Sequence, residues 1–229
     1  MPKLNFTGTG AAYYPKLGNT SAWFRINETL YLLDCGATVF ERLAGGNAFA
    51  GVRRITVFIT HLHADHSGSL GLLLCYGHDV LGIVSRVVCP LEEMGEFLRL
   101  SGVEPDAYEW QREMEAPDGN GVSVKFIPVQ HVEEIPANGL LLCDGKEIIY
   151  YSGDAASVPE PVLADFQRGN IRRIYQDTAL GDTQSHCTLE HLKQDIGPGD
   201  RERVFCMHLD SSCEETLRAA GFRVAEQSK

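Results

Sequence analysis

Long apolar runs are missing from this 229-residue sequence: no stretch is long enough to cross a membrane, and none follows Lys3 near the N-terminus. The first absence argues against a membrane protein, and the second argues against a secretory signal peptide. We therefore expect a cytoplasmic protein that does not contact a membrane.

Paired cysteines are also missing. The seven cysteines are scattered along the chain, are odd in number and never occur in CxxC spacing. This pattern argues against a disulfide framework and against a thiolate zinc site. We expect most of them to be buried as small apolar side chains.

Positive charge is scarce as well. Twenty Lys and Arg residues stand against 31 Asp and Glu residues, the formal net charge is −11, and no segment is rich in Lys and Arg. Proteins that bind long nucleic acids neutralise many phosphates with basic side chains, so a long polyanion is a poor partner for this chain. A small substrate in a local pocket remains compatible with the composition.

The chain contains enough apolar residues for a sizeable core, since 44% of its residues are hydrophobic. We predict one domain that covers residues 1–229. Strand-like runs flank Asn27-Glu28 and Asp144-Gly145, and both pairs of runs read as β-hairpins. Strands and helices are mixed throughout, which favours the α/β class.

Further elements follow from periodicity and from turn residues. The predicted helices cover residues 91–100, residues 189–196 and a segment from Ser212, where Ser212 and Glu215 have the spacing of a capping box and Gly221 would end the helix. The predicted buried strands cover residues 53–60, 122–130 and 204–207. The polar segment 102–121 is predicted to be a surface connection or lid.

Four apolar strands run into a residue that can bind a metal ion. VFIT precedes His61, IPVQ precedes His131, IIYYSG precedes Asp154, and VFCM precedes His208. Strand ends at one edge of a sheet are rigid and can converge, which is what an ion requires from distant parts of a chain. We therefore predict a metal site at such an edge.

The stretch THLHADH, residues 60–66, adds further candidates. In an extended segment His61 and His63 point to the same side and can bind one ion together. Asp65 and His66 are adjacent, so the chain must turn there before both can face a second ion.

Each ion then needs more ligands, which the other strand ends can supply. His131 can complete the first site, His208 can complete the second, and Asp154 can bridge the two with its two oxygens. Imidazole and carboxylate without thiolate favour Zn²⁺, with Mn²⁺ or Fe²⁺ as alternatives. Two such ions per chain would hold a water molecule that is ionised to hydroxide at neutral pH. They would also stabilise the attacking and leaving oxygens of a displacement reaction.

These residues resemble the metallo-β-lactamase superfamily, because THLHADH has the HxHxDH form and the later His131, Asp154 and His208 follow in the order of its other ligands. The stretches FTGTGAAYYPKLGNTSAWF, LLDCGATVFERL and SGD are similar to the RNase Z-like branch. The resemblance implies an αββα sandwich, with two mixed sheets and helices on the outer faces. It also implies phosphodiester hydrolysis at a dinuclear zinc site, with Asp65 positioning the attacking water.

Two later segments, QDTAL and SHCTLEHL, resemble the RNase Z segments whose carboxylate and histidine pass a proton to the leaving oxygen. By this resemblance Asp177 would orient His186, and His186 would be the general acid. The chain departs from the pattern in two ways: the carboxylate is an aspartate, one methylene shorter than glutamate, and Gln176 stands where the family has a histidine.

The chain also lacks the long arm with which RNase Z grips transfer RNA, and its compact form is similar to the phage anti-Pycsar phosphodiesterases. That resemblance implies a homodimer that hydrolyses small cyclic mononucleotides, in the host cytoplasm if a phage encodes it. The alternatives are an RNase Z-like endonuclease, another hydrolase of a cyclic phosphodiester or lactone, and a nucleotide-binding sponge without turnover. Tyr108 and Trp110 could stack on a base, with core packing or dimer contact as the other readings.

Overall fold

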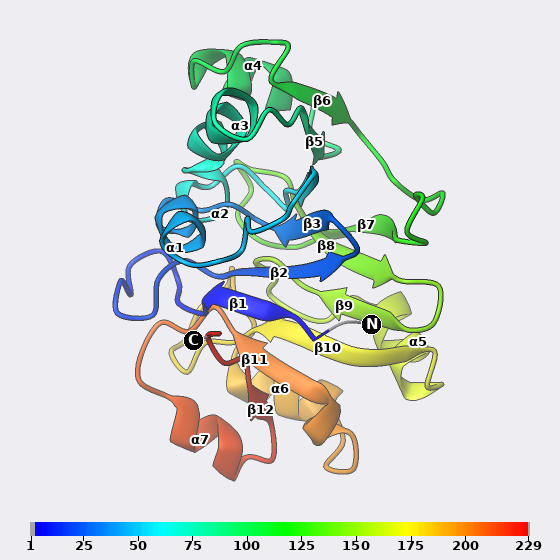
Figure 1. Ribbon diagram of the computed structural model, residues 1–229. Helices are drawn as coiled ribbons and strands as arrows, with labels where there is room; N and C mark the ends of the chain where they lie inside the picture. Colours follow the sequence, from blue (N-terminus) through cyan, green and yellow to red (C-terminus); the bar gives the residue numbers. More distant parts are fainter. Residues whose placement is uncertain (1–2, 229) are drawn as a thin grey trace.

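The computed structural model describes residues 3–228 and has four layers. Two six-stranded mixed sheets lie face to face, and helices cover the outer face of each (Figure 1). The predicted αββα sandwich is therefore confirmed.

The first sheet has the spatial order β1-β2-β3-β4-β5-β6. Its strands are β1 (Asn5–Gly8), β2 (Ser21–Ile26), β3 (Thr29–Leu33), β4 (Arg54–Phe58), β5 (Ser85–Val88) and β6 (Tyr108–Gln111). β1, β2 and β3 are antiparallel, and the pairs from β3 to β6 are parallel. Every residue of β3 is buried, because this strand lies inside the sheet and is covered on both faces.

The second sheet has the order β12-β11-β10-β9-β8-β7. Its strands are β7 (Ser123–Val129), β8 (Ala137–Cys143), β9 (Ile148–Tyr151), β10 (Ile171–Asp177), β11 (Val204–Met207) and β12 (Arg223–Val224). β7, β8 and β9 are antiparallel, and the pairs from β9 to β12 are parallel. Both sheets thus contain parallel strands whose carboxyl ends lie at one edge.

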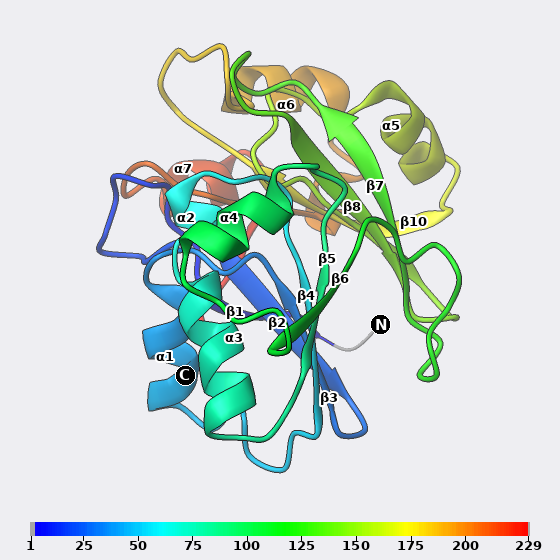
Figure 2. The ribbon, with the colours of Figure 1, turned by 90° about the horizontal axis from the view of Figure 1, so that it is seen from above.

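The outer layers consist of short helices (Figure 2). α1 (Val39–Gly45), α3 (Leu70–Asp79) and α4 (Met94–Leu100) pack on the first sheet, α5 (Glu160–Gln167), α6 (Leu189–Asp195) and α7 (Glu214–Ala219) pack on the second, and the single turn α2 (Ala64–Ser67) follows β4. No helix among the described residues is long and apolar enough to span a membrane. Of the seven cysteines, all of which are free, five are buried and two are half-buried, as expected.

Both predicted hairpins form, but their turns differ. β2 and β3 are joined by the two residues Asn27 and Glu28, and Asn27 has a φ of 53°. In the β8–β9 hairpin Cys143 pairs with Ile148, so the loop has four residues instead of two. The cause is the Asp144 side chain, whose Oδ1 accepts hydrogen bonds from the two backbone N–H groups of residues 146 and 147.

Two local predictions are wrong, and a third is only partly right. The strand predicted over residues 122–130 is present as β7, but it lies at the edge of its sheet and is only partly buried. The capping box is not formed, since α7 is preceded by Cys213 and its N-terminus has no side-chain cap. The segment 102–121 contains the strand β6, which pairs with β5 and extends the first sheet.

The two aromatic residues of β6 pack against the core of the first sheet. The indole Nε1 of Trp110 donates a hydrogen bond to the carbonyl of Cys89 at 3.0 Å. This placement supports the core-packing reading of Tyr108 and Trp110 over the base-stacking one.

Candidate metal centre

The metal-capable side chains meet at the edge where the two sheets present their strand ends. His61 follows β4, His131 follows β7, Asp154 follows β9, and His208 follows β11. Together with His63, Asp65 and His66 they form two groups, and within each group one ligand atom per residue lies within 4.8 Å of all the others. The structure thus brings together all seven residues that the sequence singled out as metal ligands.

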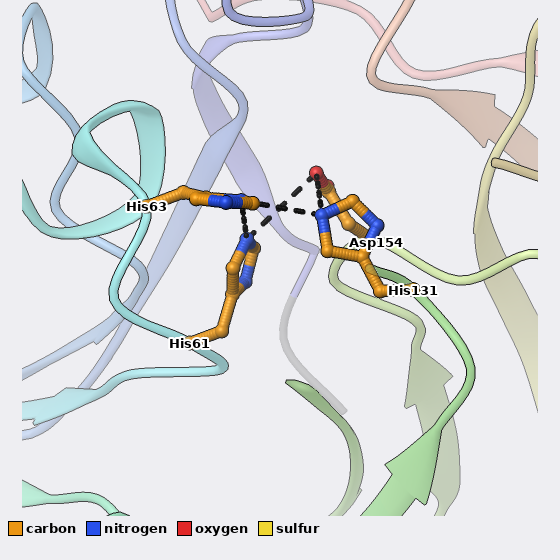
Figure 3. A group of neighbouring side chains, drawn as sticks. All are labelled: His61, His63, His131 and Asp154. Atoms are coloured by element: carbon orange, nitrogen blue, oxygen red, sulfur yellow. Dashed lines mark hydrogen bonds and ion pairs between the residues drawn. The ribbon is translucent and has the colours of Figure 1, made fainter. Parts of the chain in front are cut away.

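The first group consists of His61, His63, His131 and Asp154 (Figure 3). Nδ1 of His63 lies 3.0 Å from Nε2 of His61 and 3.2 Å from Nε2 of His131. The Oδ2 atom of Asp154 lies 3.8 Å from the same nitrogen of His61 and 3.7 Å from that of His131. Three ring nitrogens and one carboxylate oxygen therefore face a common point, which suits a cation with tetrahedral coordination.

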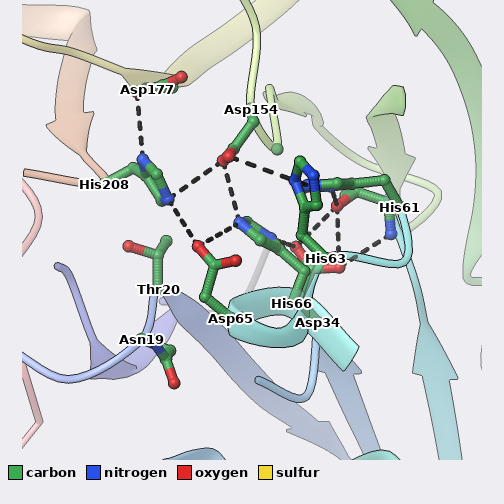
Figure 4. Close-up of polar contacts among 12 residues, drawn as sticks. Asn19, Thr20, Asp34, His61, His63, Asp65, His66, Asp154, Asp177 and His208 are labelled. Carbon is green, nitrogen blue, oxygen red and sulfur yellow. Dashed lines mark hydrogen bonds and ion pairs between the residues drawn. The ribbon is translucent and has the colours of Figure 1, made fainter. Parts of the chain in front are cut away.

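The second group consists of Asp65, His66, Asp154 and His208 (Figure 4). Nε2 of His208 lies 3.2 Å from Oδ2 of Asp65 and 3.3 Å from Oδ1 of Asp154. Nε2 of His66 is 3.0 Å from the same Asp154 oxygen. Asp154 thus turns one oxygen toward each group.

Two atoms of the second group show that a cation fits there. Nε2 of His66 and Oδ1 of Asp154 are both buried, and although they lie 3.0 Å apart, neither makes a hydrogen bond of good geometry. Buried polar atoms without a partner are costly, and a shared cation would satisfy both. The donor set contains imidazole and carboxylate but no thiolate, so the residues present fit a divalent ion such as Zn²⁺.

Groups behind the imidazoles fix which ring nitrogen faces the centre. Nδ1 of His66 donates to Oδ2 of Asp34 at 2.9 Å, and Nδ1 of His131 donates to the carbonyl of Ser185 at 2.9 Å. Because Nδ1 of each ring is used in this way, Nε2 is the atom that faces the centre, and it offers its lone pair to an ion once its proton is displaced. These contacts orient the rings before any ion binds.

Asp34 is the functional residue that the sequence analysis missed. It follows β3, it is fully buried, and its φ is 61°. Besides His66, it accepts hydrogen bonds from the backbone N–H and the hydroxyl of Thr60, and that hydroxyl accepts from Nδ1 of His61 at 3.0 Å. A signal was present, because the apolar run TLYLL ends in this aspartate just as other strands end in candidate ligands.

The turn after β4 depends on a close backbone approach. α2 starts after His63 and carries Asp65 and His66 toward the second group. Gly36, in the loop after β3, lies so close that a Cβ there would overlap the carbonyl group of Asp65. The hydroxyl of Ser67 donates to the carbonyls of Leu62 and His63, and this holds the turn from the other side.

The predicted pair of Asp177 and His186 is formed beside the second group. Asp177 is buried at the end of β10, and its Oδ2 accepts a hydrogen bond of 2.6 Å from Nδ1 of His186. Its Oδ1 lies 3.4 Å from Nδ1 of His208. The shorter aspartate side chain therefore reaches its histidine, and the same carboxylate supports a second one.

Charge coupling within the centre shifts several pKa values. Burial opposes the charged form of His208, but Asp154 and Asp177 raise its pKa to about 10. Burial likewise opposes ionisation of Asp154, but His208 and His66 hold the pKa of this carboxyl well below its usual range. The pKa of His61 falls far below its usual value because of burial and the nearby charge of His66. The neighbouring histidines thus favour the ionised form of Asp154, which is the form that a cation requires of a carboxylate ligand.

His186 has a different environment. Its side chain is about a quarter exposed, at 27%, so it can meet a molecule from solvent. Burial acts to lower its pKa, but the hydrogen bond and the charge of Asp177 outweigh burial and raise it. A protonated imidazole is thus favoured next to the two groups.

Comparison with known proteins gives one family. Residues 2–78 and 92–228 match the family described as "Anti-Pycsar protein Apyc1". The protein of that name from Bacillus phage vB_BveM-Goe7 is 27% identical over an aligned length of 253 positions, and the alignment covers 99% of this chain and 96% of that relative.

Solved structures show the same fold at lower identity. The metallo-β-lactamase fold protein YhfI from Bacillus subtilis has a TM-score of 0.76 and 15% identity, with 99% of this chain and 97% of that chain covered. The short form of human tRNase Z, ELAC1, has a TM-score of 0.72 and 21% identity, with 98% and 96% covered. The chain therefore has the metallo-β-lactamase fold.

Proposed function

This chain belongs to the Anti-Pycsar protein Apyc1 family, and from that membership we propose that it is a metal-dependent phosphodiesterase that opens small cyclic mononucleotides. The observation that carries the proposal is the pair of His and Asp groups that share Asp154. This sharing is what a two-metal hydrolase requires.

The two groups divide the ligands between two ions. The first ion would be held by His61, His63, His131 and Asp154, and the second by Asp65, His66, His208 and Asp154. We propose Zn²⁺ for both, with Mn²⁺ as the alternative, because nitrogen donors predominate. When bound, such ions lower the pKa of water and neutralise charge on phosphoryl oxygens.

The chain's own residues then handle the protons. Oδ2 of Asp65 faces His66 and His208, and we assign its carboxylate to orienting the attacking water. Hydrolysis forms one P–O bond and breaks the ester bond to the ribose oxygen. His186 is held by Asp177 through Nδ1, so its other nitrogen can donate the proton that the departing ribose oxygen needs. The product is a linear monophosphate.

A small substrate fits this chain better than RNA does. The net charge of −11 disfavours a long polyanion, and no segment is long and basic enough to serve as an RNA-gripping arm. The likeness to human tRNase Z nevertheless makes an RNase Z-like endonuclease the second candidate.

Incubating zinc-loaded protein with 3′,5′-cyclic nucleotides and, separately, with a transfer RNA precursor distinguishes the candidates. We expect linear monophosphates from the cyclic nucleotides, no RNA cleavage, and no product with His63→Ala. Cleavage of RNA alone would establish the endonuclease, and tight binding of cyclic nucleotides without product would establish a sponge.

Two further expectations stay predictions. The resemblance to anti-Pycsar enzymes implies a homodimer, which sedimentation analysis would detect as twice the mass of 25.2 kDa. It also implies action in the cytoplasm, or the host cytoplasm if a phage encodes the chain.

A further inference from the structure

A second concave surface lies away from the metal centre, at the other end of β10. This groove of about 870 Å³ is bounded by the start of β1 and by β10, β11 and β12, and we call it the β12 groove. Arg172 and Arg173 line it at the beginning of β10, whereas Asp177 at the end of the same strand belongs to the metal centre. None of the residues that line the groove belongs to the two His and Asp groups.

The charge of the β12 groove is opposite to that of the whole chain. Six basic side chains line it, namely Lys3, Arg172, Arg173, Arg203, Arg218 and Arg223, against the acidic Glu202 and Glu226. The chain as a whole has a net charge of −11, so this concentration of cations is local. A groove of this kind attracts anions.

Several of these cations are available to a ligand. Arg203 pairs with Asp200, and Arg218 pairs with Glu226. Within residues 3–228, no ion pair is formed by Lys3, Arg172, Arg173 or Arg223. Arg223 lies over the Phe205 ring, so Lys3, Arg172 and Arg173 remain for a dianionic group. Guanidinium is the side chain best shaped for phosphate.

Aromatic rings line the same groove. The rings of Tyr175 and Phe205 stack with centroids 5.0 Å apart and an interplanar angle of 26°, and Phe6 lies behind Tyr175 at 5.6 Å. Phe205 is the partly exposed member, and the guanidinium carbon of Arg223 lies 5.9 Å from its ring centroid. Tyr175 and Arg223 flank Phe205 from the two neighbouring strands, and the guanidinium lies over the Phe205 ring. The flat surface that a nucleobase can stack on is therefore the guanidinium of Arg223.

We infer that the β12 groove is a second nucleotide site, which binds a nucleoside monophosphate outside the metal centre. The base lies on the guanidinium of Arg223, which covers Phe205, and Arg172 and Arg173 hold the phosphate. The volume suits such a ligand, since small-molecule pockets measure about 300–1,000 Å³. The inference does not depend on the proposed reaction, because it uses none of the residues assigned to catalysis.

Calorimetric titration of zinc-loaded full-length protein with 5′-AMP tests this inference. We expect Arg173→Ala/Arg223→Ala to weaken one binding component about tenfold or more, because two cations are lost. The same component should persist in His63→Ala, which alters only the metal centre. The matched control is Arg53→Ala/Arg99→Ala, which removes two exposed arginines elsewhere that pair with Glu28 and Glu96.

Identical titrations for the wild type and the groove variant would overturn the inference, as would an equal loss in the control. Ribose 5-phosphate provides the second arm: weaker binding than that of 5′-AMP supports base stacking, and equal binding overturns the nucleotide assignment. Cyclic nucleotide turnover should stay unchanged in the groove variant. Failure of the groove site and failure of the proposed reaction are thereby separate results.

Discussion

At the scale of single residues, three buried carboxylates organise the centre by each serving two partners. Asp154 faces both His and Asp groups, Asp34 supports His66 directly and His61 through Thr60, and Asp177 supports His186 and His208. Loss of one such carboxylate therefore affects more than one imidazole. The role of each carboxylate can therefore be tested by measuring the zinc binding or the proton transfer of the histidines that it supports.

His63 and His186 should separate metal binding from proton transfer. His63→Ala removes a ligand nitrogen of the first group, so we expect it to lose zinc and activity together. His186→Ala should keep zinc and reduce kcat about 10²- to 10⁴-fold, the usual contribution of a general acid. Metal analysis and initial rates measure the two effects.

His191→Ala is the control for this pair, because His191 is a half-exposed surface histidine beside Asp195. It should retain both zinc and activity. Equal zinc loss in the His63 and His186 variants would contradict the division of roles.

Asp34 is predicted to act through the imidazoles that it supports. Asp34→Ala leaves Nδ1 of His66 and the hydroxyl of Thr60 without their acceptor in a buried site. We expect zinc affinity to fall about 10- to 100-fold, as is typical when a carboxylate behind a ligand is removed. Competition with a chelating dye measures the affinity.

Asp165→Ala is the matched substitution for Asp34→Ala, since Asp165 forms an exposed ion pair with Arg168 on the opposite layer. Its zinc affinity should equal that of the wild type. An Asp34 variant with wild-type affinity would show that Thr60 and the backbone suffice to hold the rings.

At the scale of elements, the sequence predicted the ends of strands better than their places in the sheets. β4 and β11 are apolar runs that stop at His61 and His208, and this local pattern is visible without the fold. The edge position of β7 had a local signal that the prediction passed over, because Pro128 lies within its apolar run and proline in a strand favours an edge. Asp34 was passed over although it ends the apolar run TLYLL, because its contacts with Thr60 and His66 form only when β3 lies beside β4.

The loop after β3 packs directly against the turn α2, and a substitution of Gly36 tests whether this contact positions the metal ligands. Gly36→Ala would place a methyl group where the Asp65 carbonyl lies, so α2 must shift. Metal sites tolerate only small displacements, so we expect a loss of zinc affinity of at least about tenfold. Isothermal titration with zinc measures it.

Gly45→Ala is the control for this unit. Gly45 is the last residue of α1, and a Cβ there meets no atom within 4 Å. This change should leave zinc affinity unchanged and stabilise the fold by roughly 0.5 kcal/mol, since alanine is the better helix former. Unchanged zinc binding in Gly36→Ala would mean that the loop and α2 move together.

At the scale of the whole molecule, the sandwich concentrates the ligands of both sheets at one edge. The first sheet supplies His61 from the end of β4, and the second supplies His131, Asp154 and His208. Binding an ion at this edge therefore ties the two sheets together, and unfolding must separate ligands that lie far apart in sequence. The stability of the fold should therefore rise with the logarithm of the free metal concentration once that concentration exceeds the Kd.

Thermal unfolding measures this coupling. At a free zinc concentration about 100 times the Kd, a single site that exists only in the folded state adds about 2.7 kcal/mol. For a chain of this size that corresponds to a rise in Tm of about 5 to 10 °C over chelator-treated protein. His63→Ala should lose the part of the rise that the first ion supplies, while Asp165→Ala, which leaves the ligands intact, should keep all of it. Equal Tm values with zinc and with chelator would refute the two-group site, because ions that span the sheets must favour the folded state.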